Sequence, residues 1–140
     1  MIGIILICLL LIISGISKSI MDVLQFKFNI SIFSKFKNQN YWNPSISWMN
    51  KYKNNDPTLG PKFFGSTTFL IWSTDAWHFF QMIMLSCLQL IPIIVLTLFL
   101  NFLGVEIIRI VLIDIGCFII IKIMFGSVFE LFFKKILIKK

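Results

Sequence analysis

The feature that most constrains this fold is a long apolar run, residues 76–105, which contains no Lys, Arg, Asp or Glu. Residues 1–17 form a second run without these four residue types. About 20 apolar residues are enough for a helix to cross the hydrocarbon layer of a membrane. The composition agrees, because 58% of the residues are hydrophobic and 14% are charged, whereas soluble domains have about 45–50% and about 25%. The sequence therefore predicts an integral membrane protein.

The expected fold class is all-α, with three transmembrane helices near residues 2–21, 79–101 and 105–126. The helical pattern that begins at residue 66 is about 50 Å long, which exceeds the ~30 Å hydrocarbon layer. Its first part is therefore expected to lie at the membrane surface, and Gly104 is expected to end the helix in the left-handed conformation. The resulting organisation is a first transmembrane helix (1–21), a basic, aromatic-rich polar segment (22–66), an interfacial helix start (67–78), a transmembrane hairpin (79–126) and a basic C-terminal tail (127–140).

The first apolar run is interpreted as a retained anchor. A secretory signal needs Lys or Arg before its apolar stretch, and here Lys18 is the first charged residue. The small residues at 14–17 keep a cleaved signal as the alternative.

The net charge of +7 comes mainly from lysines in the 22–66 segment and the C-terminal tail. Three spans would place both of these regions on one side, as the excess of lysine in cytoplasmic loops requires. We therefore expect the N-terminus outside, and the 22–66 segment and the C-terminus in the cytoplasm. Contact with anionic lipids explains this charge in an apolar chain better than nucleic-acid binding does.

The polar segment carries two further patterns. Residues 24–32 alternate apolar and polar side chains with period two, which predicts a β-strand that needs a partner. Tryptophans near lysines are typical of the headgroup boundary, so four are expected to be interfacial anchors: Trp42, Trp48, Trp72 and Trp77. We expect the segment to be ordered only against lipid, a protein partner or a second copy of the chain.

Asp75 and His78 are the candidate site in the second long run. On a helix they meet at the i,i+3 spacing. In the structural interpretation, Asp75 fixes the helix start and bonds His78. In the catalytic interpretation, Asp75 orients an imidazole that accepts a proton. One histidine and no paired cysteines provide too few ligands for a metal, and no cofactor motif is present, so neither a metal nor a cofactor is expected.

Four other polar residues are predicted to lie at membrane depth, where such groups are costly: Gln81, Gln89, Asp114 and Lys122. If the hairpin folds about Leu103, Asp114 lies level with Pro92 and about one turn from Gln89. Bonds between helices then account for most of these groups without catalysis.

Several short motifs resemble a group of short multi-pass membrane proteins from Bacteroidetes and their phages. They are Met21-Asp22, Trp42-Asn43-Pro44, Ser47-Trp48-Met49-Asn50-Lys51-Tyr52-Lys53, Gly65-Ser66-Thr67-Thr68 and Thr74-Asp75-Ala76-Trp77-His78. The resemblance implies a membrane location and no particular activity.

Three functions remain open. The first is a non-enzymatic membrane subunit of a cell-envelope complex or of a membrane-containing phage particle. The second is a holin-like oligomer that permeabilises membranes. The third is a small membrane enzyme or proton-handling unit that uses Asp75 and His78. The sequence favours the first, because a strand without a partner and an aromatic-rich loop look unfinished in a monomer. The long loop does not suit a holin, and the lack of a nucleophile motif and of a phosphate-binding glycine loop argues against an enzyme.

Overall fold

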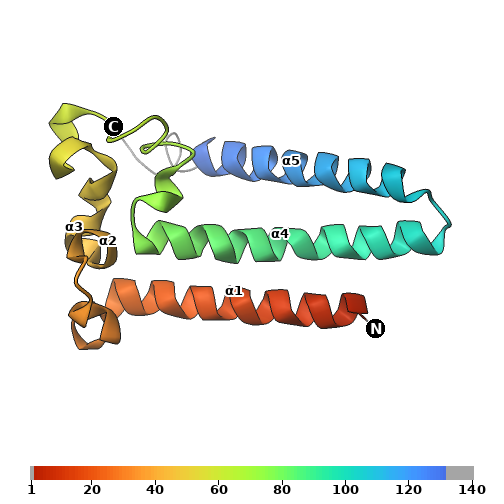
Figure 1. Ribbon diagram of the computed structural model, residues 1–140, viewed down its shortest axis with the longest axis horizontal. Helices are drawn as coiled ribbons and strands as arrows, with labels where there is room; N and C mark the ends of the chain where they lie inside the picture. Colours follow the sequence, from red (N-terminus) through yellow and green to blue (C-terminus); the bar gives the residue numbers. More distant parts are fainter. Residues whose placement is uncertain (1, 132–140) are drawn as a thin grey trace. The chain divides into compact units, whose positions relative to one another are not determined.

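The computed structural model describes residues 2–131, and within that range the chain is helical and contains no β-strand. Its long helices are α1 (Ile2–Phe26), α4 (Ala76–Phe102) and α5 (Ile107–Leu131) (Figure 1). The predicted all-α class is thus confirmed. Two of these helices, α1 and α4, are long and apolar enough to cross a membrane. Most of the predicted basic tail, including the lysines at 134, 135, 139 and 140, lies outside the described residues.

The chain divides into two compact units. One contains Met1–Cys8 and Leu88–Lys140, and the other contains Leu9–Cys87. Both α1 and α4 are therefore divided: residues 2–8 of α1 and 88–102 of α4 belong to the first unit, and the rest of each helix belongs to the second.

In the first unit, a tight turn joins the second half of α4 to α5, which runs back beside it (Figure 1). Gly104 has φ +73°. The amide of Val105 donates to the carbonyl of Leu100 at 3.1 Å, and the amide of Gly104 donates to the carbonyl of Asn101 at 3.1 Å. These two bonds are the Schellman pattern, in which a left-handed residue satisfies the last carbonyls of a helix. The predicted helix end at Gly104 is confirmed.

The register of this hairpin differs from the expected one. The hydroxyl of Thr97 donates to Oδ2 of Asp114 at 2.5 Å, so Asp114 lies opposite Thr97 rather than Pro92. The expected register placed the fold point at Leu103, but the turn closes at Gly104 and α5 begins only at Ile107. The extra turn residues shift α5 by more than one helical turn along α4.

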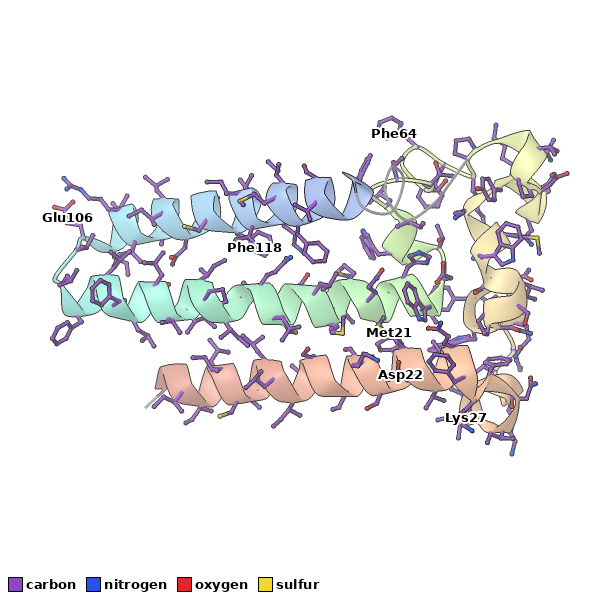
Figure 2. All side chains as sticks on the ribbon, turned by 180° about the vertical axis from the view of Figure 1, so that it is seen from behind. Met21, Asp22, Lys27, Phe64, Glu106 and Phe118 are labelled. Atoms are coloured by element: carbon purple, nitrogen blue, oxygen red, sulfur yellow. The ribbon has the colours of Figure 1, made fainter. Side chains whose placement is uncertain are left out.

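In the second unit, a series of short helices and 3₁₀ turns links the second half of α1 to the first half of α4. Its buried apolar residues are Met21, Leu24, Ala76 and Cys87. Met21 lies on the side of α1 that faces α4, whereas Lys27 points away from it (Figure 2). The short elements are η1 (Phe28–Ile30), η2 (Ile32–Lys35), α2 (Gln39–Trp42), α3 (Pro44–Ser47), η3 (Trp48–Lys51), η4 (Lys53–Asn55), η5 (Pro57–Leu59) and η6 (Ile71–Ser73).

The predicted strand over residues 24–32 is wrong, because α1 continues to Phe26 and is followed by η1 and η2. A single strand leaves its backbone groups unpaired, and these residues have no neighbouring strand. They use local bonds instead: the amide of Ser31 donates to the carbonyl of Phe28 at 3.0 Å, and the Ser31 hydroxyl donates to the same carbonyl at 2.7 Å.

The expected helix over residues 67–75 is also wrong, because α4 begins at Ala76. Hydroxyl groups in this stretch bond backbone carbonyls three residues earlier. The Ser73 hydroxyl donates to the carbonyl of Leu70 at 2.8 Å, and the Thr74 hydroxyl donates to that of Ile71 at 2.7 Å. Such bonds compete with α-helical pairing and favour turns. The apolar pattern gave no sign of this competition.

Candidate functional site at the start of α4

Asp75 stands immediately before α4 and is almost fully buried, with 2% of its surface exposed. Its Oδ1 accepts a hydrogen bond from the amide of His78 at 2.9 Å, and its own carbonyl accepts one from the amide of Phe79 at 3.1 Å. The first amides of a helix have no partner within the helix, and an aspartate at the N-cap satisfies one of them. Asp75 therefore caps α4, as the structural interpretation predicted.

The second carboxylate oxygen of Asp75 holds the imidazole of His78. Oδ2 lies 2.6 Å from Nδ1 of His78, so the predicted i,i+3 contact is confirmed. The hydroxyl of Thr74 contacts the same Oδ2 at 3.4 Å. The His78 side chain is 26% exposed, whereas that of Asp75 is 3% exposed. The pair thus has a buried carboxylate and an imidazole that reaches the surface.

The polar segment supports this capping residue through Asn50. The Asn50 side-chain amide donates to the carbonyl of Thr74 at 2.5 Å, and the ammonium of Lys62 donates to Oδ1 of Asn50 at 2.8 Å. These contacts join residues that are 24 and 12 positions apart in the chain. Sequence patterns did not single out Asn50, because a bond across such a distance leaves no periodic signal.

A second set of bonds closes the loop that carries Lys62. The hydroxyl of Ser66, a fully buried residue, donates to the carbonyl of Lys51 at 2.8 Å. The amide of Lys62 donates to the carbonyl of Lys51 at 2.9 Å, and the amide of Lys53 donates to that of Gly60 at 3.1 Å. The 22–66 segment therefore has internal order of its own, in addition to any contact with lipid or a partner.

Trp42 is the centre of an aromatic cluster in the same unit. Its ring stacks on Phe33 at 5.1 Å between centroids and meets Phe36 edge-on at 4.9 Å. It also contacts Tyr41 at 5.4 Å and Phe80 of α4 at 6.4 Å. Aromatic pairs at these separations add to the stabilisation from burial. The cluster fixes α2 against the first turns of α4.

The pKa of Tyr41 depends on the burial and the charge of this region. Burial raises the pKa of its phenol, and the negative charge of Asp75 raises it further. A half-buried phenol that is repelled by a carboxylate charge stays protonated, because a second negative charge would be costly there.

A cavity of about 220 Å³ opens beside the Asp75–His78 pair. Its walls come from the end of α1, from α3 and its continuation, and from the start of α4: Gln25, Pro44, Ser47, Trp48, Asp75, Trp77 and His78. Ser47 is 4% exposed, and within residues 2–131 its hydroxyl makes no hydrogen bond. Sequence analysis missed Ser47 and Gln25, since only the packing of short helices brings them to His78.

The other predicted tryptophans have different surroundings. Trp48 is exposed and Trp77 is half-buried, with its ring 5.2 Å from that of His78. Trp72 is half-buried in η6. Trp42 packs within the aromatic cluster, so only part of it is available to lipid. Their role as headgroup anchors stays a prediction.

The four polar residues predicted to lie at membrane depth have surroundings of their own. Gln81 is half-buried on α4. Oε1 of Gln89 and Oδ1 of Asp114 are buried and have no hydrogen-bond partner among residues 2–131. The ammonium of Lys122 lies over the ring of Phe118 at 5.3 Å.

The described part of the chain brings no three His, Cys, Asp or Glu side chains together in a group that could hold a metal ion. No protein-family model matches the chain, and neither a curated protein nor a solved structure is significantly similar to it. The chemistry of the site therefore rests on the geometry alone: a helix-capping carboxylate, an oriented imidazole and a small cavity.

Proposed function

We propose that this chain is a non-enzymatic integral membrane subunit of a larger assembly. The observation that carries the proposal is that the apolar surface of its long helices is mostly exposed. Only 17% of the most apolar window of α1 and 11% of that of α4 is buried within the protein. A core helix of a soluble protein is mostly buried, because water makes exposed apolar surface costly. Lipid hydrocarbon removes that cost.

We further propose that α5 is a third span. Its surface also consists of exposed apolar side chains, among them Ile108, Leu112, Ile119 and Ile123. Its ionisable residues have partners of the kind that spans use. Glu106 and Arg109 form an ion pair at 3.3 Å at the helix start, and Asp114 bonds Thr97 of α4. Three spans place the 22–66 segment and the C-terminus in the cytoplasm and the N-terminus outside, following the lysines.

Exposed apolar residues outside the spans support an assembly rather than a lone chain. Ile30 is 83% exposed and Phe64 is 87% exposed, and Phe64 projects from its segment (Figure 2). Lipid headgroups, a protein partner or a second copy would cover such side chains. The resemblance to short membrane proteins of Bacteroidetes and their phages favours a cell-envelope complex or a membrane-containing phage particle.

The geometry of Asp75 supports a structural role over a catalytic one. One carboxylate oxygen caps α4 and the other holds His78, so the residue is occupied by the fold. A proton-handling unit remains the second candidate function, because the imidazole of His78 borders a cavity.

Cysteine accessibility tests the topology. In a chain whose three cysteines are replaced by serine, Lys37→Cys and Lys139→Cys should react only with a reagent that reaches the cytoplasm. Phe102→Cys, at the last residue of α4, should react with an impermeant reagent from outside. Opposite labelling of Lys37→Cys and Lys139→Cys would contradict three spans, and absence from the membrane fraction would contradict the whole proposal.

Expression of the chain alone separates the subunit from its alternatives. A subunit should be degraded or remain inert without its partners, and it should migrate in a larger complex when extracted from its native membrane. Cell lysis on expression would identify a holin instead. A catalytic unit would show Asp75→Asn and His78→Gln variants that assemble normally and lose function entirely.

A further inference from the structure

The cavity beside His78 has a polarity that selects the chemistry of an occupant. The carboxylate of Asp75 lies 2.6 Å from Nδ1 of His78. A carboxylate only accepts hydrogen bonds, so the neutral imidazole carries its proton on Nδ1. Nε2 is then left with a free lone pair. In this neutral form the ring, which lines the cavity, can accept a hydrogen bond at Nε2, and the matching group on an occupant is a hydrogen-bond donor.

Ser47 adds the second half of this recognition. Its hydroxyl is in a residue that is only 4% exposed, lines the same cavity, and has no hydrogen-bond partner in the part of the chain that the structure describes. A hydroxyl without a protein partner can donate one hydrogen bond to an occupant and accept another from it. One ligand hydroxyl can serve both residues, since it donates its hydrogen to Nε2 of His78 and accepts one from Ser47.

The other residues that line the cavity favour an occupant whose hydroxyl is attached to a flat, apolar ring. Trp48, Trp77 and Pro44 line the cavity together with Gln25. Aromatic walls pack well against rings. The volume of about 220 Å³ lies below the range of about 300–1,000 Å³ usual for drug-sized ligands, so the occupant is small.

We propose that this cavity binds a small hydroxyaromatic molecule, with its hydroxyl between His78 and Ser47 and its ring between Trp48 and Trp77. No hydrogen bond joins the Ser47 hydroxyl to His78 among residues 2–131, which distinguishes the arrangement from an activated serine nucleophile. The inference goes beyond the proposed membrane subunit and does not depend on the number of spans.

Two probes with the same ring system isolate the hydroxyl. 1-Naphthol has the donor, and 1-methoxynaphthalene has a methyl group in its place. Calorimetric titration of the full chain in detergent, corrected with protein-free micelles, should show saturable binding of 1-naphthol about tenfold tighter than that of the ether, the equivalent of one good hydrogen bond.

The variants then assign the contacts. His78→Phe keeps the backbone amide that Asp75 caps, and it should abolish the preference for 1-naphthol. Ser47→Ala should weaken 1-naphthol binding several-fold and leave the ether unaffected. Trp77→Phe should weaken both probes, while Trp72→Phe, a tryptophan outside the cavity, should weaken neither.

The proposal is overturned if neither probe binds saturably to the folded chain, or if both bind equally well. It is also overturned if the preference survives in His78→Phe or is undiminished in Ser47→Ala. Circular dichroism of each variant shows whether it is folded, and Ser47→Ala keeps the test decisive if His78→Phe does not fold.

Discussion

Two aspartates lie in apolar sequence, Asp75 at the start of α4 and Asp114 in the middle of α5, and the protein satisfies them differently. Both carboxylate oxygens of Asp75 have partners, the amide and the ring nitrogen of His78, within one turn of the same helix. Asp114 has one partner, the Thr97 hydroxyl of another helix, while its Oδ1 is buried and unpaired within residues 2–131.

The difference follows from where each residue stands on its helix. The first amides of a helix are free donors, so a carboxylate there is satisfied by its own element. In the middle of a helix every amide is already paired, and a carboxylate must find a donor on a neighbour. A helix start can therefore hold a buried charge by local structure alone, whereas a helix centre depends on the register between helices.

The largest loss of stability is expected when Asp75, the carboxylate that is satisfied within its own helix, is removed. Asp75→Ala eliminates the cap and the bond to His78, and it should lower the free energy of unfolding of the second unit by about 2 kcal/mol. Chemical denaturation in detergent, followed by tryptophan fluorescence, measures the loss. Asp22→Ala is the matched control, because Asp22 pairs with Lys18 on an exposed face of α1 and should change little. Equal losses in the two variants would contradict the capping role.

A smaller effect is expected where the partner comes from another helix. Thr97→Val keeps the side-chain shape and removes the donor to Asp114, which should cost about 1 kcal/mol in the association of α4 with α5. Thr97→Ser retains the hydroxyl and should be near neutral. Denaturation with a helix-dissociating detergent compares the variants. A Thr97→Val protein as stable as the parent would mean that Asp114 does not depend on this register.

The turn that sets the register should be about as sensitive. Gly104 has φ +73°, and alanine in that conformation is strained by about 1 kcal/mol. Gly104→Ala should therefore destabilise the α4–α5 hairpin. Gly15→Ala is the control, because Gly15 lies inside α1 with no atom near an added Cβ. If alanine is equally harmless at both positions, the left-handed helix end does not determine the register.

The smallest effect is expected at Asp56, an exposed capping residue. It shows what a capping bond contributes where burial does not add to it. Asp56 accepts the amide of Thr58 at 2.8 Å, and this bond lowers the pKa of its carboxyl below the ordinary 3.8. A lowered pKa means that the stabilisation is present above the ordinary value and is lost as the pH falls through the folded one. Hydrogen exchange of the Thr58 amide should accelerate, relative to that of its neighbours, only at pH values below 3.8. An Asp56→Asn variant with the same pH profile would rule out the carboxylate as its cause.

The sequence predicted those features of the site that depend on near neighbours. The i,i+3 spacing of Asp75 and His78 predicted their contact, and the structural interpretation placed the helix start at Asp75. Gly104 predicted the end of α4 because glycine adopts positive φ without a Cβ clash. The long uncharged runs predicted α1 and α4, since apolar length is a property of the chain itself.

The sequence failed where a local pattern had two readings. Alternation over residues 24–32 indicated a strand, but a strand exists only with a partner, and local bonds at Ser31 prevailed. The helical pattern before Ala76 was overridden by the hydroxyls of Ser73 and Thr74. In both stretches a side chain bonded the backbone at short range, and hydropathy does not record that competition.

By itself the sequence determined the apolar length of α1 and α4, which is a property of consecutive residues, and the capped ends of α4, which depend on residues within about one turn. Only the tertiary structure decided that Asn50 reaches Thr74, that Thr97 faces Asp114, and that Ser47 shares a cavity with His78. The physical reason is distance along the chain. These contacts depend on how short helices close loops and how helices set their register, and a difference of a few turn residues moves every such partner.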